Sequence, residues 1–338
     1  MNLETTTAIY AGNVSIGYGV LIAVTSMISS WLITFSLVTA PGKRSQDKAG
    51  SVRKIVALLL YLPLFAIWGG AFGRLVHWYS HYETYNGIWN AFRSFTGSYH
   101  EAGMVLGFFI SAFFSSMVCM QEDRKDFISA AAVGQMLFLS LVSLVSLFNS
   151  ADRGKAVITD PSYQRLPISV PTLVASGDTE YRTAVFFWKF MVLLFIAVLS
   201  LIFHFTKKSV LYTYVCYFSS MALLDSARYD ASFLRSNGFV SLMQVVAGVF
   251  LIVSIIAAVR HSVIKNRFRV WHVISVIVFL AGLGLTIYME YYVQRHGNLY
   301  VFCYLVMAGA CLIMALSVIL TYGSGEERKR RIRRAKSE

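Results

Sequence analysis

Residues 184–203, AVFFWKFMVLLFIAVLSLIF, are almost entirely apolar and contain one charged side chain, Lys189. A helix of about 20 residues rises about 30 Å, which matches the hydrocarbon thickness of a lipid bilayer. The stretch therefore predicts a transmembrane helix. Eight other stretches have a similar character, near 13–39, 55–79, 101–120, 127–148, 210–229, 240–259, 270–291 and 300–322. We therefore expect an all-α polytopic membrane protein with about nine transmembrane helices.

The composition of the whole chain favours the same class. Of 338 residues, 57% are hydrophobic and 14% are charged, against about 25% charged in an ordinary globular domain. A soluble core of this size cannot bury so many apolar side chains, so lipid must cover the remainder. The net charge of +13 reflects membrane topology better than nucleic acid as a partner. All four cysteines lie in apolar stretches, which argues against a disulfide framework.

The positions of the basic residues predict the orientation of the chain. If the N-terminus is outside, the cytoplasmic stretches carry 20 of the 30 lysines and arginines. The positive-inside rule then places the C-terminus in the cytoplasm. The stretch 149–183 faces outward and is long enough to form a small cap. The basic tail 323–338 anchors this topology, with binding of anionic lipid headgroups as the other reading.

Polar residues from four predicted helices gather at one depth. Counting along the helices places Tyr18, Arg74, His100, and Asp225 with Arg228 near the outer phospholipid headgroups. An i,i+3 spacing puts Asp225 and Arg228 on one helix face. Arginine suits phosphate, histidine transfers protons near neutral pH, and a carboxylate orients either of them. The pattern therefore predicts a phosphate-facing site.

Simpler roles stay open for the same residues. Asp225 and Arg228 would then form an ion pair that serves packing, while Tyr18 and His100 would be interfacial anchors. Gly69, Gly70 and Gly73 are expected to let two helices approach closely.

A second group of residues has the spacing of a metal site. His77 and His81 lie at i,i+4, and Glu83 or the pair His100-Glu101 would supply further ligands for zinc or another transition metal. The same stretch continues with tyrosine and tryptophan, which is typical of an aromatic belt at a membrane interface. Both readings stay open.

Five parts of the chain between residues 13 and 259 carry a resemblance to a known family. In order they are SIGYG at 15–19, GGAFGRL at 69–75, FRSFTGSYH at 92–100, DFI at 126–128, and a last group of Tyr217, Asp225, Arg228-Tyr229-Asp230, Ser241 and Gln244. This order resembles that of the prolipoprotein diacylglyceryl transferases of the bacterial cytoplasmic membrane. The resemblance implies a seven-helix core over 1–259, an additional two-helix hairpin over 260–322, and the basic tail.

The resemblance implies transfer of a diacylglyceryl group from phosphatidylglycerol to the cysteine thiol of a lipoprotein precursor peptide. Glycerol phosphate would be released, membrane lipids would surround the protein, and no metal or organic cofactor would be required. His100 would act as the base, and Asp225 would position Arg228. The residues assigned in this way are His100, Asp225 and Arg228 for catalysis, and Tyr18, Arg74, Asn149 and Arg228 for phospholipid binding.

The chain also departs from the family pattern. Glu101-Ala102 stands where the family has two glycines after its histidine, and 141–151 lacks the family arginine while keeping Asn149. Whether Arg93, Arg153, Arg165 or Lys189 substitutes for that arginine stays open. Two alternative functions remain: an inactive or repurposed relative that binds lipid or a lipidated partner, and a metal-dependent membrane enzyme that uses His77, His81 and His100.

Overall fold

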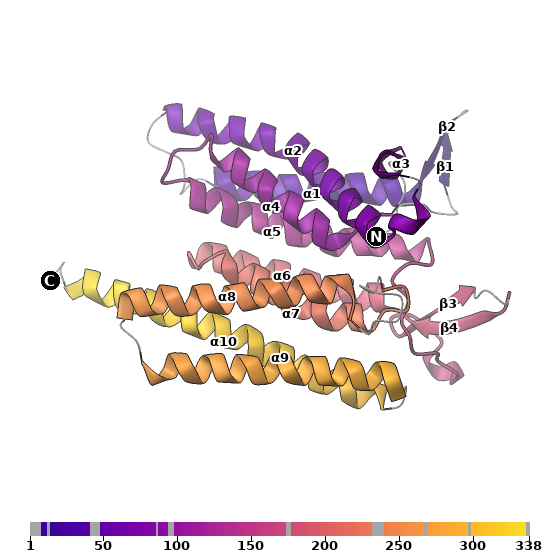
Figure 1. The fold of residues 1–338 in the computed structure, drawn as a ribbon. Helices are drawn as coiled ribbons and strands as arrows, with labels where there is room; N and C mark the ends of the chain where they lie inside the picture. Colours follow the sequence, from indigo (N-terminus) through magenta and orange to yellow (C-terminus); the bar gives the residue numbers. More distant parts are fainter. Residues whose placement is uncertain are drawn as a thin grey trace. The chain divides into compact units, whose positions relative to one another are not determined.

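The computed structural model describes residues 8–11, 14–40, 48–85, 87–93, 98–173, 177–231, 240–266, 269–296 and 299–335. Helices dominate this part of the chain (Figure 1). Within it, seven helices are long and apolar enough to cross a membrane. They are α1 (Tyr18–Thr39), α2 (Lys48–Ser80), α5 (Arg124–Ser143), α6 (Val185–Phe205), α8 (Leu242–Asn266), α9 (Val270–His296) and α10 (Tyr300–Ala335). By the length and composition of its helices, the chain is a multi-pass membrane protein.

Two helices are shorter than the sequence predicts. α4 (Glu101–Ser116) and α7 (Leu211–Ser226) have 16 residues each, where the expected stretches were 101–120 and 210–229. A helix of that length rises about 24 Å, less than the hydrocarbon core. α7 ends before Arg228 because the backbone of Arg228 pairs with Gly154 in an antiparallel bridge.

Short strands interrupt the helical pattern in two places, so the fold is mostly helical rather than all-α. β1 (Ala8–Ala11) and β2 (Val14–Gly17) form an antiparallel hairpin before α1. The first helix therefore begins at Tyr18, not near residue 13, because the β-branched residues Val14 and Ile16 lie in the hairpin. In the stretch 149–183, β3 (Ser169–Leu173) pairs antiparallel with β4 (Thr179–Thr183).

The remaining elements are short helical turns. They are η2 (Tyr82–Thr84), α3 (Ile88–Phe92), η3 (Leu144–Leu147), which continues α5, and η4 (Pro161–Tyr163).

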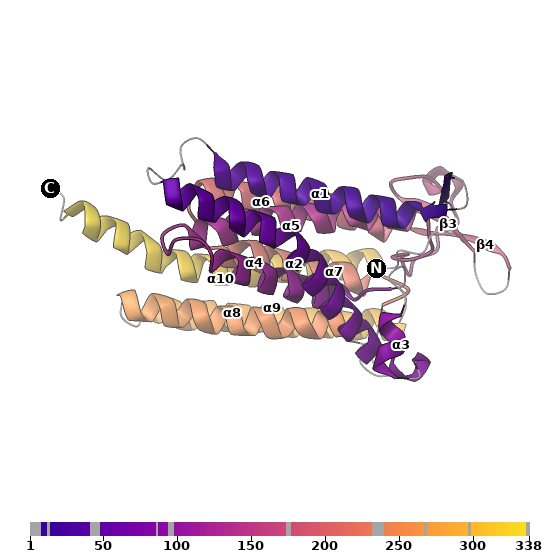
Figure 2. The same ribbon diagram turned by 90° about the horizontal axis from the view of Figure 1, so that it is seen from above.

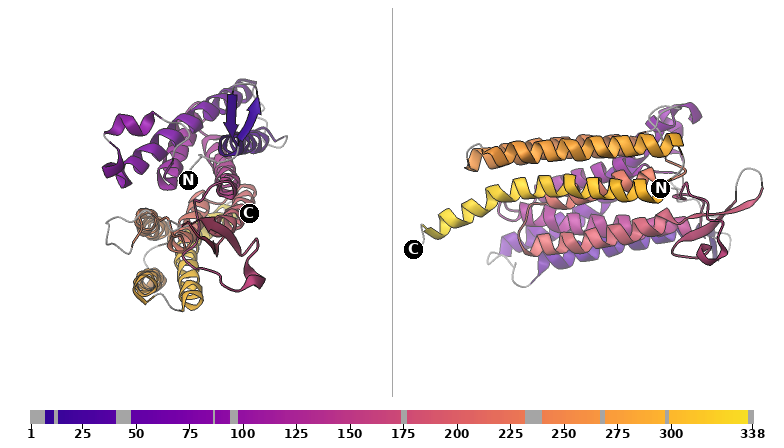
Figure 3. Two further views of the ribbon diagram at one scale, coloured as in Figure 1. Left: turned by 90° about the vertical axis from the view of Figure 1, so that its right-hand side faces the viewer. Right: turned by 90° about the horizontal axis from the view of Figure 1, so that it is seen from below.

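The chain divides into two compact units. The first contains residues up to Thr213 together with Arg228–Asp230, and the second contains Tyr214–Ala227 and the residues from Ala231 onward. In the first unit, α5 packs against α1, α4 and α6 (Figure 2). In the second unit, α10 packs against α8 and α9 (Figure 3). The boundary expected between 259 and 260 falls inside one continuous helix, α8.

Glycines on α4 bring this helix against the backbone of α2. A Cβ atom at Gly103 would lie 2.2 Å from the carbonyl oxygen of Phe72, and one at Gly107 would lie 2.2 Å from that of Trp68. No side chain fits at these two positions without moving a helix backbone. The two helices therefore pack at a distance that only glycine permits.

The glycines of α2 play unequal parts in this contact. A Cβ atom at Gly69 would lie 2.0 Å from the Phe108 ring, and one at Gly73 would lie 2.7 Å from Met104, whereas a Cβ at Gly70 would meet no atom within 4 Å. The predicted close approach is confirmed for Gly69 and Gly73 and is wrong for Gly70.

Substitution of Gly107 by alanine should destabilise the protein by about 1–3 kcal/mol, the usual cost of overpacking. Unfolding of the full chain in detergent micelles would measure this loss. Gly70→Ala is the matched control on α2, and it should be neutral or slightly stabilising because alanine favours helix over glycine by about 1 kcal/mol. Equal stability of Gly107→Ala and wild type would contradict the close contact.

Candidate functional site

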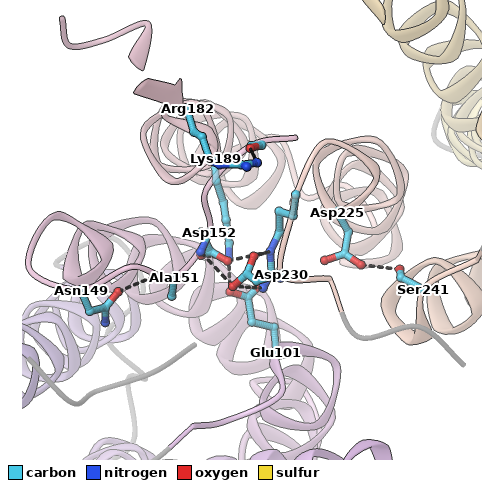
Figure 4. Close-up of polar contacts among 11 residues, drawn as sticks. Glu101, Asn149, Ala151, Asp152, Arg182, Lys189, Asp225, Asp230 and Ser241 are labelled. Carbon is cyan, nitrogen blue, oxygen red and sulfur yellow. Dashed lines mark hydrogen bonds and ion pairs between the residues drawn. The ribbon is translucent and has the colours of Figure 1, made fainter. Parts of the chain in front are cut away.

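A chain of ion pairs joins four segments of the first unit, where α4 and α6 begin and α5 has ended (Figure 4). Lys189 Nζ pairs with the carboxylate of Glu101 and lies 2.9 Å from Asp152 Oδ2. The other oxygen of Asp152 lies 2.8 Å from Arg228 Nε, and Arg228 also pairs with Asp230 at 3.1 Å. We call these five residues the ionic network.

The core of the ionic network is buried. Lys189 is 1% exposed and Asp152 is 2% exposed. A buried ion costs several kcal/mol unless opposite charges and hydrogen bonds compensate it. Here each cation contacts two carboxylates, and Asp152 contacts both cations. Asp152 is therefore the residue that connects the two halves of the network.

The backbone around Asp152 is built to hold this position. Asp152 has a φ of 54°, a left-handed conformation that is uncommon outside glycine but tolerated by aspartate. Its N–H donates to Asp230 Oδ2 at 3.1 Å, and the N–H of Tyr229 donates to the carbonyl of Arg153 at 2.7 Å. The segment Arg228–Asp230 is thus tied to 152–154 by main-chain as well as side-chain contacts.

The charges around Asp152 also determine its protonation. Burial alone would raise the pKa of this carboxyl group, but Arg228 and Lys189 outweigh burial and hold the pKa well below its usual range. Asp152 is therefore ionised at neutral pH.

Arg74 occupies a buried position at the end of the α2–α4 contact where α4 begins. Its Nη1 donates to the carbonyl of Ser98 at 3.0 Å, and its guanidinium lies over the Tyr99 ring, 4.6 Å from the centroid. These two contacts fix Arg74 beside the segment that leads into His100.

His100 directly precedes the ionic network residue Glu101. Its backbone N–H donates to the carbonyl of Gly73 at 2.9 Å, so the glycine contact also positions the histidine. Its Nδ1 is buried and has no hydrogen-bond partner in the part of the chain that the structure describes. Burial, with a contribution from the charge of Arg228, lowers the pKa of His100 to about 3. The imidazole is therefore neutral at pH 7, with its Nδ1 left open to a hydrogen-bond partner from a bound ligand.

Tyr18 packs against Phe148, the residue directly before Asn149. The Tyr18 ring stacks on Phe148 with 5.0 Å between the centroids. Asn149 Oδ1 accepts a hydrogen bond from the N–H of Ala151 at 2.9 Å, and its carbonyl accepts one from Arg153 Nη2 at 2.7 Å. The predicted role of Tyr18 and Asn149 in phospholipid binding stays a prediction.

Asp225 has a different environment from the one expected. Its carboxylate accepts a hydrogen bond from the hydroxyl of Ser241, within the second unit (Figure 4). The expectation that Asp225 and Arg228 share a helix face is wrong because α7 ends at Ser226. Arg228 pairs with the carboxylates of Asp152 and Asp230.

His77 and His81 lie close together, with ring centroids 4.3 Å apart. His81 Nδ1 lies 2.8 Å from the hydroxyl of Ser80 and 3.1 Å from the carbonyl of His77. Across the described ranges, no group of three or more His, Cys, Asp or Glu side chains is placed to hold a metal ion.

Sequence reasoning missed Glu101, Asp152 and Asp230 as members of the site. A signal was available for the first two, because Lys189 is the single charge in residues 184–203 and an intramembrane lysine requires an acidic partner. The sequence alone does not say which carboxylate provides it.

Comparison with known proteins adds no relative. No protein-family model matches this chain, and no curated protein matches it. The function must therefore be argued from the residues and contacts of the site.

Asp152→Asn should destabilise the protein by about 3 kcal/mol or more, because Lys189 and Arg228 each lose a carboxylate partner in a buried setting. Unfolding in mixed micelles at pH 7 would measure the loss. The folded pKa lies below the ordinary value of about 4, so this contribution is present above that pH and is lost as the pH falls further. The exposed Glu122→Gln is the control, and an equal effect of both variants would contradict a structural role for Asp152.

Proposed function

We propose that this chain transfers a diacylglyceryl group from phosphatidylglycerol to the cysteine thiol of a lipoprotein precursor at the outer face of the bacterial cytoplasmic membrane. The observation that carries the proposal is the position of His100. His100, neutral and with its Nδ1 buried, directly precedes Glu101, which the ionic network links through Lys189 and Asp152 to Arg228. His100 and Arg228 are two of the three residues that the family resemblance assigns to catalysis, and Asp225 is the third.

The topology proposed for this reaction has nine crossings. The seven long helices are supplemented by α4 and α7, which have 16 residues each and would span a locally thinned bilayer. The N-terminus is outside and the C-terminus is cytoplasmic, since most lysines and arginines then lie in cytoplasmic stretches. This orientation puts His100, Asp152 and Arg228 near the outer leaflet.

The proposed reaction is a displacement at carbon. His100 takes the proton of the cysteine thiol as the sulfur forms a bond to the glyceryl carbon of the lipid. The bond from that carbon to the phosphate oxygen breaks, and its electron pair leaves with glycerol phosphate. Arg74 and Arg228 supply positive charge near the developing negative charge of the leaving phosphate.

A second candidate is a repurposed relative that binds lipid without catalysis. It is favoured by the pairing of Arg228 with two carboxylates, which already neutralise its charge. An assay of diacylglyceryl transfer by the reconstituted protein separates transfer from binding alone.

Reconstituted wild-type protein in phosphatidylglycerol vesicles should add a diacylglyceryl group to a peptide with a lipoprotein signal cysteine, as detected by mass spectrometry. His100→Ala should lower the rate about 100-fold or more, as is usual for loss of a general base, and Arg228→Ala should lower it as strongly. Wild type should also rescue cells depleted of their own diacylglyceryl transferase, and His100→Ala and Arg228→Ala should rescue them far less.

Two substitutions at the opposite end of the first unit serve as controls. His204→Ala removes another buried histidine, near Ser129 at the start of α5, and Arg124→Ala removes an exposed arginine there. Both should retain transfer. A well-folded wild type without product would favour the binding-only candidate. Retained activity in His100→Ala would show that His100 is not the general base.

The acid side of the pH profile should lack a histidine transition near pH 6.5. Because the pKa of His100 is lowered to about 3, the base stays unprotonated when the pH falls from 7 to 5. Single-turnover rates in the same vesicles would measure this dependence. A rate that falls in proportion to protonation, with a midpoint near 6.5, would contradict the buried and neutral state of His100.

A further inference from the structure

Arg153 is a buried arginine whose hydrogen-bonding capacity is only partly used. The residue is 6% exposed, and its Nη2 donates to the carbonyl of Asn149 at 2.7 Å. Its Nε and Nη1 are buried and have no hydrogen-bond partner among the residues that the structure describes. Buried donor groups without an acceptor are costly, more so on a charged group.

The guanidinium of Arg153 is held in a defined place. It lies over the Phe186 ring, 4.9 Å from the centroid, and its own carbonyl accepts the N–H of Tyr229. The following residue, Gly154, has no room for a side chain, since a Cβ atom would lie 1.7 Å from Thr183 Oγ1. The arginine is therefore fixed by its neighbours on both sides rather than free to turn toward solvent.

A second arginine, Arg182, lies against the same backbone. Its Nη1 lies 3.5 Å from the carbonyl of Gly154, its guanidinium lies over the Tyr229 ring, and its Nε is also buried without a partner in the described ranges. Two positively charged groups thus flank Gly154.

The carboxylates near Arg153 balance its charge without using its donors. Asp152 and Asp230 interact with Arg153 electrostatically. Asp152 contacts Lys189 and Arg228, and Asp230 contacts Arg228 and the N–H of Asp152. The site therefore tolerates a charged guanidinium but leaves two of its nitrogens to be satisfied by an external acceptor.

We propose that Arg153 binds a phosphate oxyanion through these two nitrogens. Guanidinium groups pair strongly with phosphate, and the oxyanion supplies the acceptors that the protein lacks. This inference rests on the proposed function and deepens it: the phosphate is that of the phospholipid donor or of the released glycerol phosphate.

Binding of phosphate compounds to the purified full chain in detergent tests the inference. The probes are dihexanoyl phosphatidylglycerol below its micelle concentration, inorganic phosphate at constant ionic strength, and dihexanoylglycerol, which has no phosphate. Wild type should bind at least one phosphate probe and not dihexanoylglycerol. Binding of dihexanoyl phosphatidylglycerol alone identifies the lipid headgroup as the source, and equal binding of inorganic phosphate identifies free phosphate.

Arg153→Gln should weaken binding of the phosphate probe about tenfold or more, because charge-assisted hydrogen bonds are lost. Arg153→Lys keeps the charge but not the planar donors, so its affinity should lie between those of Arg153→Gln and wild type, and it serves if Arg153→Gln fails to fold. Arg124→Gln, an exposed arginine at the other end of the unit, should bind like wild type.

Two results would overturn the inference: no binding of either phosphate probe by wild type, or unchanged binding by a folded Arg153 variant. The readout is separate from transfer activity. Phosphate binding that depends on Arg153, together with no transfer by wild type, would refute the proposed reaction and leave the binding site in place.

Discussion

The ammonium group of Lys189, held between Glu101 and Asp152, is the contact on which the site depends. An unpaired charge in an apolar helix would cost several kcal/mol, so the start of α6 stays next to the start of α4 and to the residues after η3. Asp152 then has an oxygen left for Arg228. One buried cation thereby fixes the relative positions of segments that are far apart in the sequence.

A second constraint, the glycine contact between α2 and α4, acts on the same end of the unit without any charge. Gly103 and Gly107 allow α4 to lie against the carbonyl groups of α2, and the carbonyl of Gly73 receives the N–H of His100. Close packing therefore places the imidazole, while ion pairing places the cations. The candidate site exists because the two constraints act on neighbouring residues: the glycine contact positions His100, and the ion pair with Lys189 positions Glu101.

The long helices were predictable from the sequence because hydropathy is a local property, and 184–203 alone identifies α6. The ends of α1 and α7 were not predictable in the same way. The end of α7 depends on the bridge of Arg228 with Gly154, a contact between distant residues. For the same reason, the candidates His100 and Arg228 could be selected by depth, but the pairing of Arg228 with Asp152 could not be predicted.

The membership of Arg228–Asp230 in the first unit bears on how the protein is made. Asp230 follows Asp152 by 78 residues in the chain, yet the two are bonded in the finished fold. At a synthesis rate of about 5–20 residues per second, the segment emerges several seconds after Asp152. Lys189 follows Asp152 by 37 residues and is made in the first half of that interval. In the second half Asp152 has Lys189 but not Arg228, so the first unit cannot complete its charge pairing until α7 has been synthesised.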